Sequence, residues 1–407
     1  MKKLSLASKT FLGFALGIVI GLIFKQSATA LQPIGDLFLN LIKMIVVPLI
    51  FFSITTGITS IGDITKLRKI GLKTLLYFIA TTALAGLLGI LVANLIKPGL
   101  GVVLDAGSKT AIAASENQEL PSFGKMIVDM FPSNPVQALA EGNLMQIIVF
   151  AIFLGISCVL IGDKADPVLK VIQTGSDIMM KMTEIVMQFS PIGVTALMAA
   201  TIGEYGLKVF GPLAKLILSD YAGLIAVLLL IYIPLLIFLA KVPLKKFFKF
   251  APKLWVVTAS TTSSSGSLPV TIDVASNDLG VEEELSTFVL PLGATMNMNG
   301  AVVYYATAVV FVSQMYGIHL SISQQILTVL SATLISVGSP GIPGGGIVMT
   351  IMLLNLMGLP ADVVGMIAGM YRILDMGHTT INCTGDLVST LCIARTNKMF
   401  RKDPSLR

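Results

Sequence analysis

Long apolar stretches, separated by shorter polar ones, run along the first 240 residues and predict membrane-spanning helices. With some tilt, such stretches can cover the roughly 20 residues that a bilayer requires. The stretch 97–122 is rich in Pro, Gly, Ser and acidic residues and predicts an exposed loop, whereas 163–181 is polar and amphipathic. The predicted spans are 11–24, 37–58, 74–96, 144–161, 182–202 and 221–240.

The pattern changes near residue 254, where the apolar stretches become short and interrupted. Residues 258–267 are rich in Ser and Thr, and their apolar flanks, 254–257 and 270–275, are each too short to span a bilayer. Irregular backbone at membrane depth is tolerated only where protein or a water-filled cavity surrounds it. We therefore expect a re-entrant helix-turn-helix hairpin, and the alternative is an ordinary cytoplasmic loop.

Two further interruptions follow the first hairpin. Asn297, Asn299 and two glycines break the apolar stretch 288–316 and predict unwound backbone with free carbonyl groups. Residues 336–346 contain two prolines and five glycines and cannot form a helix, which predicts a second hairpin within 326–357. Paired interrupted segments indicate a transporter whose binding site lies at the interface of a structural repeat.

The last predicted span, 363–393, carries a polar stripe on one helical face. Two carboxylates among apolar neighbours are costly in a membrane unless they face a cavity or a partner. The stripe therefore indicates a polar ligand or ion site inside a bilayer, and the alternative is the exposed face of a helix in a soluble protein. Its members are Asp375, His378, Thr379, Asn382 and Asp386.

Composition argues against the soluble alternative. The 407-residue chain is 55% hydrophobic and 12% charged, with a mean hydropathy of +0.88, whereas soluble domains have about 25% charged residues. The net charge of +6 does not indicate a nucleic-acid partner, and no cleavable signal peptide is evident. The three cysteines have no metal-ligand spacing and predict small buried thiols: Cys158, Cys383 and Cys392.

The basic residues predict the orientation in the membrane. All of the basic clusters fall on the cytoplasmic side if both termini lie inside and eight helices cross. The loop 97–122 is then external, and the two hairpins enter from opposite faces. We expect a multi-pass protein of the cell membrane. The clusters lie at 2–9, 66–73, 241–253 and 395–402.

Four motifs of the C-terminal half come in a recognisable order. They are SSSGSLP at 263–269, NMNG at 297–300, GIPG at 341–344, and LDMG at 374–377, which is followed by Asn382 and by TGD at 384–386. With KMIVVPL at 43–49, they resemble the dicarboxylate/amino acid:cation symporters, the family of glutamate and neutral amino acid transporters. The likeness covers nearly the whole chain.

The resemblance implies an all-α membrane protein with eight transmembrane helices and two re-entrant helical hairpins, assembled as a homotrimer. Each protomer would combine a scaffold with a transport part that moves across the bilayer like an elevator. The expected division is scaffold helices 1–2 at 1–73, helix 3 of the transport part and the external loop at 74–122, scaffold helices 4–5 at 123–220, and the transport core (helix 6, hairpin 1, helix 7, hairpin 2 and helix 8) at 221–407.

The resemblance also implies two sets of site residues. Asp375 would bind the amino group of the substrate, and Asn382, Ser264 and the hairpin tip around Ile342 would hold its carboxylate. The complete expected substrate set is Ser264, Ser265, Met298, Ala301, Ile342, Gly346, Asp375, His378, Thr379 and Asn382. Hard oxygen ligands suit Na⁺, and the expected cation ligands are Thr81, Thr82, Gly293, Thr295, Asn297, Asn299, Ser336, Ser339, Asn382 and Asp386.

Two departures from the family pattern concern the substrate. Acidic-substrate members carry Arg where this chain has His378 and Thr where it has Ala301, and imidazole does not replace the bidentate fork of Arg. We therefore expect a bacterial symporter that takes up a small neutral amino acid with the Na⁺ gradient. The alternatives are an acidic amino acid or a C4-dicarboxylate, with H⁺ as a rival coupling ion. His378 could also be a core residue that never meets substrate.

Two other departures concern cations. Na⁺-coupled relatives have Asp where this chain has Asn299 and Tyr where it has Phe78, so a buried cation site lacks one negative charge and we expect about two coupled Na⁺. Arg372 would lie near the tip of the first hairpin, where some relatives carry an Arg at the position of Thr262. The alternative is a cation that extends toward water from a helix end.

Other classes of function fit the chain less well. A channel also uses interrupted polar helices, but paired hairpins and a carboxylate for an amino group favour saturable uptake. An enzyme is not expected, because the sequence has no strand-turn-helix nucleophile elbow and no metal-ligand spacing.

Overall fold

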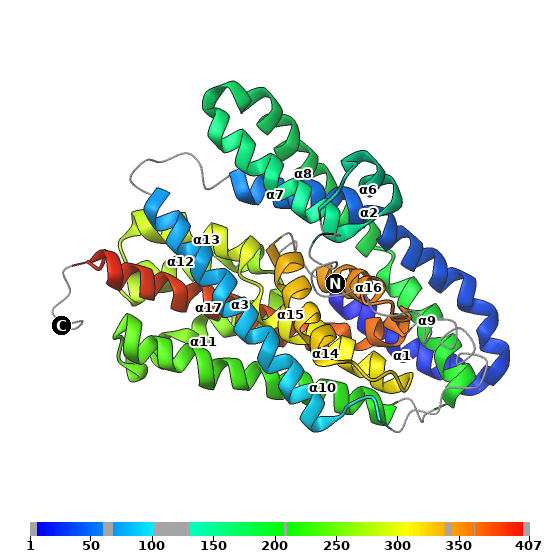
Figure 1. Cartoon of the computed structure of the whole chain (residues 1–407). Coiled ribbons are helices and arrows are strands. Elements are labelled where there is room, and N and C mark those ends of the chain that lie inside the picture. Colours follow the sequence, from blue (N-terminus) through cyan, green and yellow to red (C-terminus); the bar gives the residue numbers. More distant parts are fainter. Residues whose placement is uncertain are drawn as a thin grey trace, which may run out of the picture.

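The computed structural model describes residues 6–59, 68–100, 128, 131–206, 210–337, 344–361 and 363–401. These residues form an assembly of packed helices (Figure 1). Those of the first half are α1 (Leu6–Phe24), α2 (Gln32–Thr59), α3 (Arg68–Ile96), α6 (Pro135–Glu141), α7 (Leu144–Ile161), α8 (Asp166–Met187), α9 (Ser190–Tyr205) and α10 (Phe210–Val227). Those of the second half are α11 (Leu244–Thr261), α12 (Ser264–Asp273), α13 (Glu283–Met296), α14 (Asn299–Met315), α15 (Ile322–Val337), α16 (Gly345–Leu356) and α17 (Val364–Asn397).

Five helical stretches of the described chain are long and apolar enough to cross a bilayer. They agree with the multi-pass membrane protein that the composition predicts, while the total of eight crossings stays a prediction. The stretches are Leu12–Phe38, Ile70–Ile96, Gln146–Met179, Gly211–Ala240 and Glu283–Met315.

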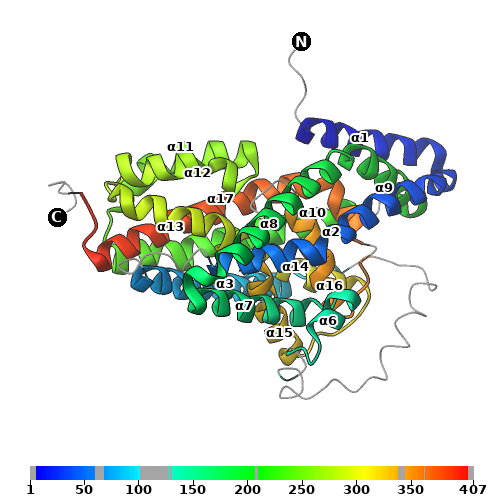
Figure 2. The same ribbon diagram turned by 90° about the horizontal axis from the view of Figure 1, so that it is seen from above.

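Helices α1, α2, α7, α8 and α9 pack on one another. Glycines at every fourth position of α1 contact α9, and a Cβ at Gly17 would lie 2.6 Å from the carbonyl oxygen of Thr195. The hydroxyl of Thr195 donates to the carbonyl oxygen of Gly13 at 2.9 Å. Small residues are the common means of close helix contact in lipid. Both views place α1 and α9 at the end of the molecule opposite to α11 and α12 (Figures 1 and 2).

A second group of helices surrounds α17. Helix α3 packs along α14 and α10, and α17 is contacted by α10, α11, α13 and α14. Helix α10 continues through the π-helical segments η4 (Leu228–Tyr232) and η5 (Leu235–Ala240). The sixth predicted span therefore begins at Phe210, and the border predicted between residues 220 and 221 falls inside a continuous helix.

The first hairpin consists of two short helices, as the Ser/Thr-rich stretch predicts. Helix α11 ends at Thr262, which has a left-handed backbone (φ 50°), and α12 follows at once. The hydroxyl of Ser263 caps α12 by accepting from the amide of Gly266 at 3.0 Å. That this hairpin re-enters a membrane stays a prediction.

Three charged residues brace the other end of this hairpin. The ammonium group of Lys253 on α11 donates to Asp273 at 2.5 Å and to Asp278 at 3.0 Å. The hydrogen bond from Lys253 lowers the pKa of Asp273. All three groups are at least partly exposed, so the contacts fix the arms relative to each other more than they stabilise the fold.

The chain is also broken between α13 and α14, where the sequence predicts unwound backbone. Asn297 (φ −104°, ψ 76°) and Met298 (φ −101°, ψ 48°) leave the helical region. The arms of the second hairpin are α15 and α16. Residues 338–343 between them lie outside the described part of the chain, and so do Ser339 and Ile342, which the sequence analysis placed in the cation and substrate sets.

Candidate functional site

The middle of α17 meets the break between α13 and α14 and the first residues of α16. The polar stripe of α17 is inside the protein rather than on its surface: its five members are each at most 7% exposed. Because α17 is contacted by α10, α13, α14 and α16 over this length, the stripe faces other helices. The structure therefore collects most of the predicted site residues in one buried region.

Asp375 lies at the junction of α17 and the second hairpin. One carboxylate oxygen accepts from the backbone amide of Gly344 at 3.1 Å, and the other lies 3.5 Å from the hydroxyl of Tyr371. Gly344 directly precedes α16, so the positive end of that helix faces the carboxylate. A Cβ at Gly346 would lie 1.9 Å from the Tyr371 hydroxyl, which explains the glycine there.

His378 contacts a residue that the sequence analysis missed. Its Nε2 lies 2.9 Å from the Oδ2 of Asp220 on α10, and the two side chains are 1% and 0% exposed. The imidazole ring stacks on Tyr304, with ring centroids 4.9 Å apart. A span that starts at residue 221 leaves Asp220 out by one position. An acidic residue within the apolar stretch Gly211–Ala240 was the signal that could have found it.

Asn382 holds the start of α14. Its Oδ1 accepts from the backbone amides of Gly300 at 2.7 Å and Ala301 at 3.4 Å, and its Nδ2 lies 3.2 Å from the sulfur of Met298. These bonds satisfy amide groups that the first turn of a helix leaves open. Met298, Ala301 and Asn382, all predicted substrate residues, are thus brought together, and Thr379 is buried next to His378 on the same helix.

The serines of the first hairpin stand at the start of α12. Ser264 is buried and Ser265 is half-buried. Arg372 of α17 reaches this tip: its guanidinium donates to the carbonyl oxygen of Ser260 at 2.7 Å and to the hydroxyl of Thr262. The expected position of Arg372 at the hairpin tip therefore agrees with its contacts, although its side chain is only partly buried.

Asp386 lies among oxygen-bearing groups of the α13–α14 break. Its Oδ1 accepts from the Nδ2 of Asn297 at 2.8 Å, and a Cβ at Gly293 would lie 2.5 Å from the same oxygen. The Oδ1 of Asn297 is buried without a hydrogen-bond partner in the described part of the chain. One carboxylate beside an amide oxygen without a partner offers the hard oxygen donors that suit a monovalent cation.

The remaining predicted cation ligands bond to one another or to the backbone. Asn299 accepts from the hydroxyl of Thr82 at 2.6 Å and donates to the hydroxyl of Tyr232 at 2.8 Å. The hydroxyl of Thr81 donates to carbonyl oxygens of its own helix, as do those of Thr295 and Ser336. The cluster around Asn299 is a neutral set of hydrogen bonds, which agrees with the loss of a negative charge there.

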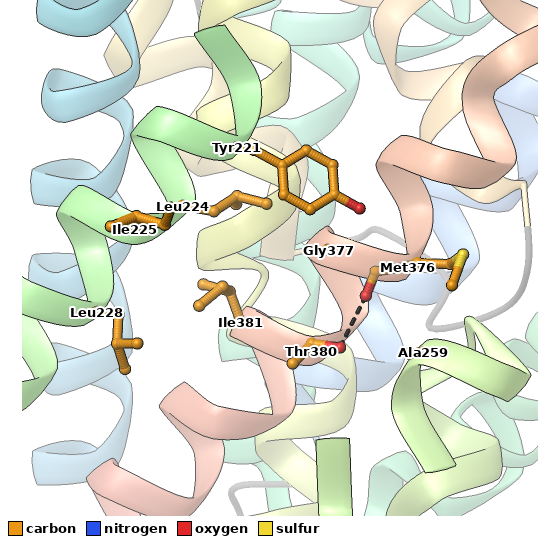
Figure 3. A pocket seen from close by; sticks show the side chains of 9 residues that line it. All are labelled: Tyr221, Leu224, Ile225, Leu228, Ala259, Met376, Gly377, Thr380 and Ile381. Carbon is orange, nitrogen blue, oxygen red and sulfur yellow. Dashed lines mark hydrogen bonds between the residues drawn. The ribbon is translucent and has the colours of Figure 1, made fainter. Parts of the chain in front are cut away.

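An apolar cavity of about 260 Å³ lies on the other side of α17 (Figure 3). Two lining hydroxyls make hydrogen bonds: that of Thr380 donates to the carbonyl oxygen of Met376 at 2.7 Å (Figure 3), and that of Tyr221 donates to the carbonyl oxygen of Ile373 at 2.7 Å. None of the predicted site residues lines it, so the cavity is separate from the polar region. The lining residues are Tyr221, Leu224, Ile225, Leu228, Ala259, Met376, Gly377, Thr380 and Ile381.

Comparison with known proteins places this arrangement in one family. The sodium:dicarboxylate symporter family matches residues 6–396. The chain is 35% identical to the proton/glutamate-aspartate symporter of Bacillus subtilis over 99% of this chain and 97% of that protein. It is 34% identical to the proton/sodium-glutamate symport protein of Geobacillus stearothermophilus, with the same coverage. It is 31% identical to the C4-dicarboxylate transport protein of B. subtilis, over 96% of this chain and 93% of that protein.

These relatives are transporters and not enzymes, and the buried polar region between interrupted helices is what a membrane carrier requires. The likeness covers nearly the full length of this chain and of each relative. The chain is therefore a multi-pass membrane transporter that belongs to the sodium:dicarboxylate symporter family.

Proposed function

We propose that this protein is a symporter that takes up an acidic amino acid together with cations. The observation that carries this proposal is the order of charged groups along α17. Arg372, Asp375 and His378 follow one another at every third residue: Arg372 contacts the first hairpin, Asp375 the second hairpin, and His378 the carboxylate of Asp220 on α10. A substrate with two carboxylates and one ammonium group is the complement of two basic side chains and one carboxylate.

Each charge of the substrate has a partner in this arrangement. The ammonium group would bind Asp375, whose hydrogen-bond partners among the described residues are one amide and one hydroxyl. The α-carboxylate would bind backbone amides at the hairpin tips and the amide of Asn382. The second carboxylate would bind a basic side chain, since an uncompensated buried charge is strongly unfavourable.

This proposal replaces the neutral amino acid that the sequence alone favoured. The names of the relatives refer to glutamate, aspartate and C4-dicarboxylates, and none of those names refers to a neutral amino acid. The inference from His378 and Ala301 counted only the missing Arg. It left out the contacts of Arg372 with the hairpin tip. It also left out the carboxylate of Asp220, which can stabilise a protonated His378.

A C4-dicarboxylate is the second candidate, favoured by one relative of that name. It has no ammonium group to offset the carboxylate of Asp375, which is 7% exposed. A carboxylate buried beside a dianionic substrate would be repelled by it. We therefore place an acidic amino acid before a C4-dicarboxylate.

Asp386, Asn297 and Gly293 would hold a coupled Na⁺, and Thr295 and Ser336 would contribute to a second. The cluster of Asn299, Thr82 and Tyr232 is already saturated with hydrogen bonds, so a coupling number of about two Na⁺ remains our proposal. Na⁺ is a co-substrate in this account and crosses the membrane with the amino acid.

The division into a scaffold and a moving transport part, and the homotrimer, also belong to this proposal. One border changes. Because α10 is continuous from Phe210 and packs on α3, α14 and α17, we assign the whole of α10 to the transport part.

Gly293→Ala is expected to raise the Na⁺ concentration for half-maximal substrate binding at least about tenfold, since overpacking a filled site costs about 1–3 kcal/mol. The added Cβ would lie 2.5 Å from a carboxylate oxygen of Asp386 and displace it. The measurement is a Na⁺ titration of aspartate binding to purified protein. Gly211→Ala is the matched control, because a Cβ there meets nothing within 4 Å. An unchanged Na⁺ requirement in a folded Gly293→Ala variant would remove Asp386 from the cation site.

The substrate class is tested by calorimetry with the purified protein in Na⁺ and in choline buffer. We expect Na⁺-dependent heat with aspartate or glutamate, a weaker response to succinate, and none with serine or alanine. Binding of serine or alanine without binding of either acid would overturn the proposal and restore the neutral substrate.

A further inference from the structure

We infer that His378 and Asp220 form the site that carries a transported proton, and that this proton cancels the negative charge of the pair and gives His378 a second N–H donor for the second carboxylate of the substrate. The inference rests on the proposed function, because only an acidic substrate needs that donor. It starts from a pair of ionisable side chains that the sequence analysis did not bring together.

The pair lies close to the proposed substrate site, so a proton bound to it can cross the membrane together with the substrate. Asp220 lies in an apolar membrane-spanning stretch and is fully buried, and its described ionic partner is His378 at 2.9 Å. His378 is three residues beyond Asp375 on α17, and its ring lies 5.9 Å from that of Tyr371, whose hydroxyl is near Asp375. The proton site and the ammonium site are therefore neighbours.

The two protonation states of the pair differ by one charge. With a neutral imidazole that donates from Nε2 to Asp220, the pair has a charge of −1. A second proton on the imidazole makes the pair neutral overall. A net charge at membrane depth is costly, so the neutral, protonated pair is the form suited to crossing the bilayer.

The same proton changes what Nδ1 of His378 can do. Nδ1 is buried and has no hydrogen-bond partner in the described part of the chain. When the neutral ring donates from Nε2–H to Asp220, Nδ1 is an acceptor. An acceptor at Nδ1 would repel the second carboxylate of the substrate. In the imidazolium both nitrogens are donors, so Nδ1–H becomes available to the substrate carboxylate while Nε2–H stays with Asp220.

The transfer is balanced without any other reactant. One proton from water on the loading side forms an N–H bond on His378, and the same proton leaves to water on the opposite side after the substrate has left. No electron pair moves to another molecule. The acidic substrate and the proton bind together because each makes the other more favourable, which is reciprocal by thermodynamic linkage.

Apart from the pair itself, the neighbouring ionisable groups in the described part of the chain are mostly tyrosines. Helix α10 contributes Tyr221 beside Asp220, α14 contributes Tyr304 and Tyr305, and α17 contributes Tyr371 and Asp375, with Arg372 turned to the hairpin tip. Tyrosines stay neutral over the range of a binding experiment. Asp375 must be ionised to bind an ammonium group, so its titration would strengthen binding as pH rises. Deprotonation of the proposed pair would instead weaken binding as pH rises. The direction of the pH dependence therefore distinguishes the pair from Asp375.

The test is calorimetric binding of aspartate to the full-length purified protein at fixed Na⁺, between pH 5.5 and 8.5, in buffers with different ionisation enthalpies. On the alkaline side we expect the affinity to fall about tenfold for each pH unit, with uptake of about one proton per aspartate bound. Affinity that does not change with pH, together with no proton uptake, would overturn the inference and leave the proposed function standing. Failure of aspartate, glutamate and succinate to bind at any pH would instead overturn the proposed function.

Three variants locate the proton. His378→Arg keeps a permanent charge next to Asp220, so the affinity is expected to become nearly independent of pH and the proton uptake to disappear. Asp220→Asn removes the anion that stabilises the imidazolium, so binding should require a lower pH. His319→Gln is the matched control, since His319 is the chain's second histidine and is exposed. Its pH profile should equal that of the wild type. A wild-type profile in either His378→Arg or Asp220→Asn would contradict the inference, and thermal melting shows whether each variant is folded.

Discussion

The Asp375→Asn substitution is expected to weaken aspartate binding at least about 100-fold. Asparagine keeps the shape of the side chain but removes the negative charge that offsets the substrate ammonium group. Breaking one partner of a buried ion pair costs about 3–5 kcal/mol, and about 1.4 kcal/mol corresponds to a factor of ten in affinity. The asparagine oxygen can still accept from the amide of Gly344, and its NH2 group can donate to the hydroxyl oxygen of Tyr371, so the fold should persist. Calorimetric titration with aspartate measures the dissociation constants of the variant and the wild type.

The matched control is Asp36→Asn. Asp36 is an exposed carboxylate on α2 that accepts a hydrogen bond from Gln32 at 2.9 Å, and the same change there should leave aspartate binding within about twofold. Wild-type affinity in a folded Asp375→Asn protein would show that the ammonium group binds elsewhere, and would make a substrate without an amino group the better candidate.

The Asp386→Asn substitution is expected to remove most of the Na⁺ dependence of binding. Asp386 carries the only formal charge in the set that it would form with Gly293, Asn297 and Asn382. Without it, a cation in that region is surrounded by neutral oxygen atoms alone. We expect the Na⁺ concentration for half-maximal binding to rise roughly 100-fold, which corresponds to about 3 kcal/mol. Titrating Na⁺ at fixed aspartate measures this shift.

Asp163→Asn, at an exposed position of the short helical turn η2 (Gly162–Ala165), is the control for the same chemical change. It should leave the Na⁺ titration unchanged. A folded Asp386→Asn variant with a normal Na⁺ requirement would mean that Asp386 is bound to Asn297 for structural reasons only, and that the coupled cation lies at another place.

Local sequence chemistry predicted where helices are interrupted, but it made the interruptions too long: 336–337 and 345–346 belong to α15 and α16, and 299–300 belong to α14. The Ser/Thr-rich stretch lies around the turn between α11 and α12, where Thr262 has a left-handed backbone, and Asn297 and Met298 break the chain between α13 and α14. Each of these features depends on backbone preferences of a few neighbouring residues. The spacing along α17 likewise placed its five polar residues on one buried face.

Long-range pairing was not predictable in the same way. Asp220 and His378 are 158 positions apart, and no local pattern indicates which acidic residue meets which histidine. The predicted span begins at residue 221 and so excludes Asp220. The apolar pattern cannot show that a helix starts earlier when the charged residue at its apparent border is buried against a partner. The substrate class depended on that pair and on the contacts of Arg372, which is why the neutral amino acid was favoured first.

The central claim, that this protein is a cation-coupled symporter of an acidic amino acid, is tested most directly by transport into proteoliposomes. Labelled aspartate and labelled serine are offered separately with an inward Na⁺ gradient at pH 6, and again after the Na⁺ and proton gradients are abolished. The account predicts accumulation of aspartate above equilibrium that is lost when the gradients are removed, and no accumulation of serine. Gradient-driven accumulation of serine without aspartate, or movement of aspartate that never exceeds equilibrium, would contradict it.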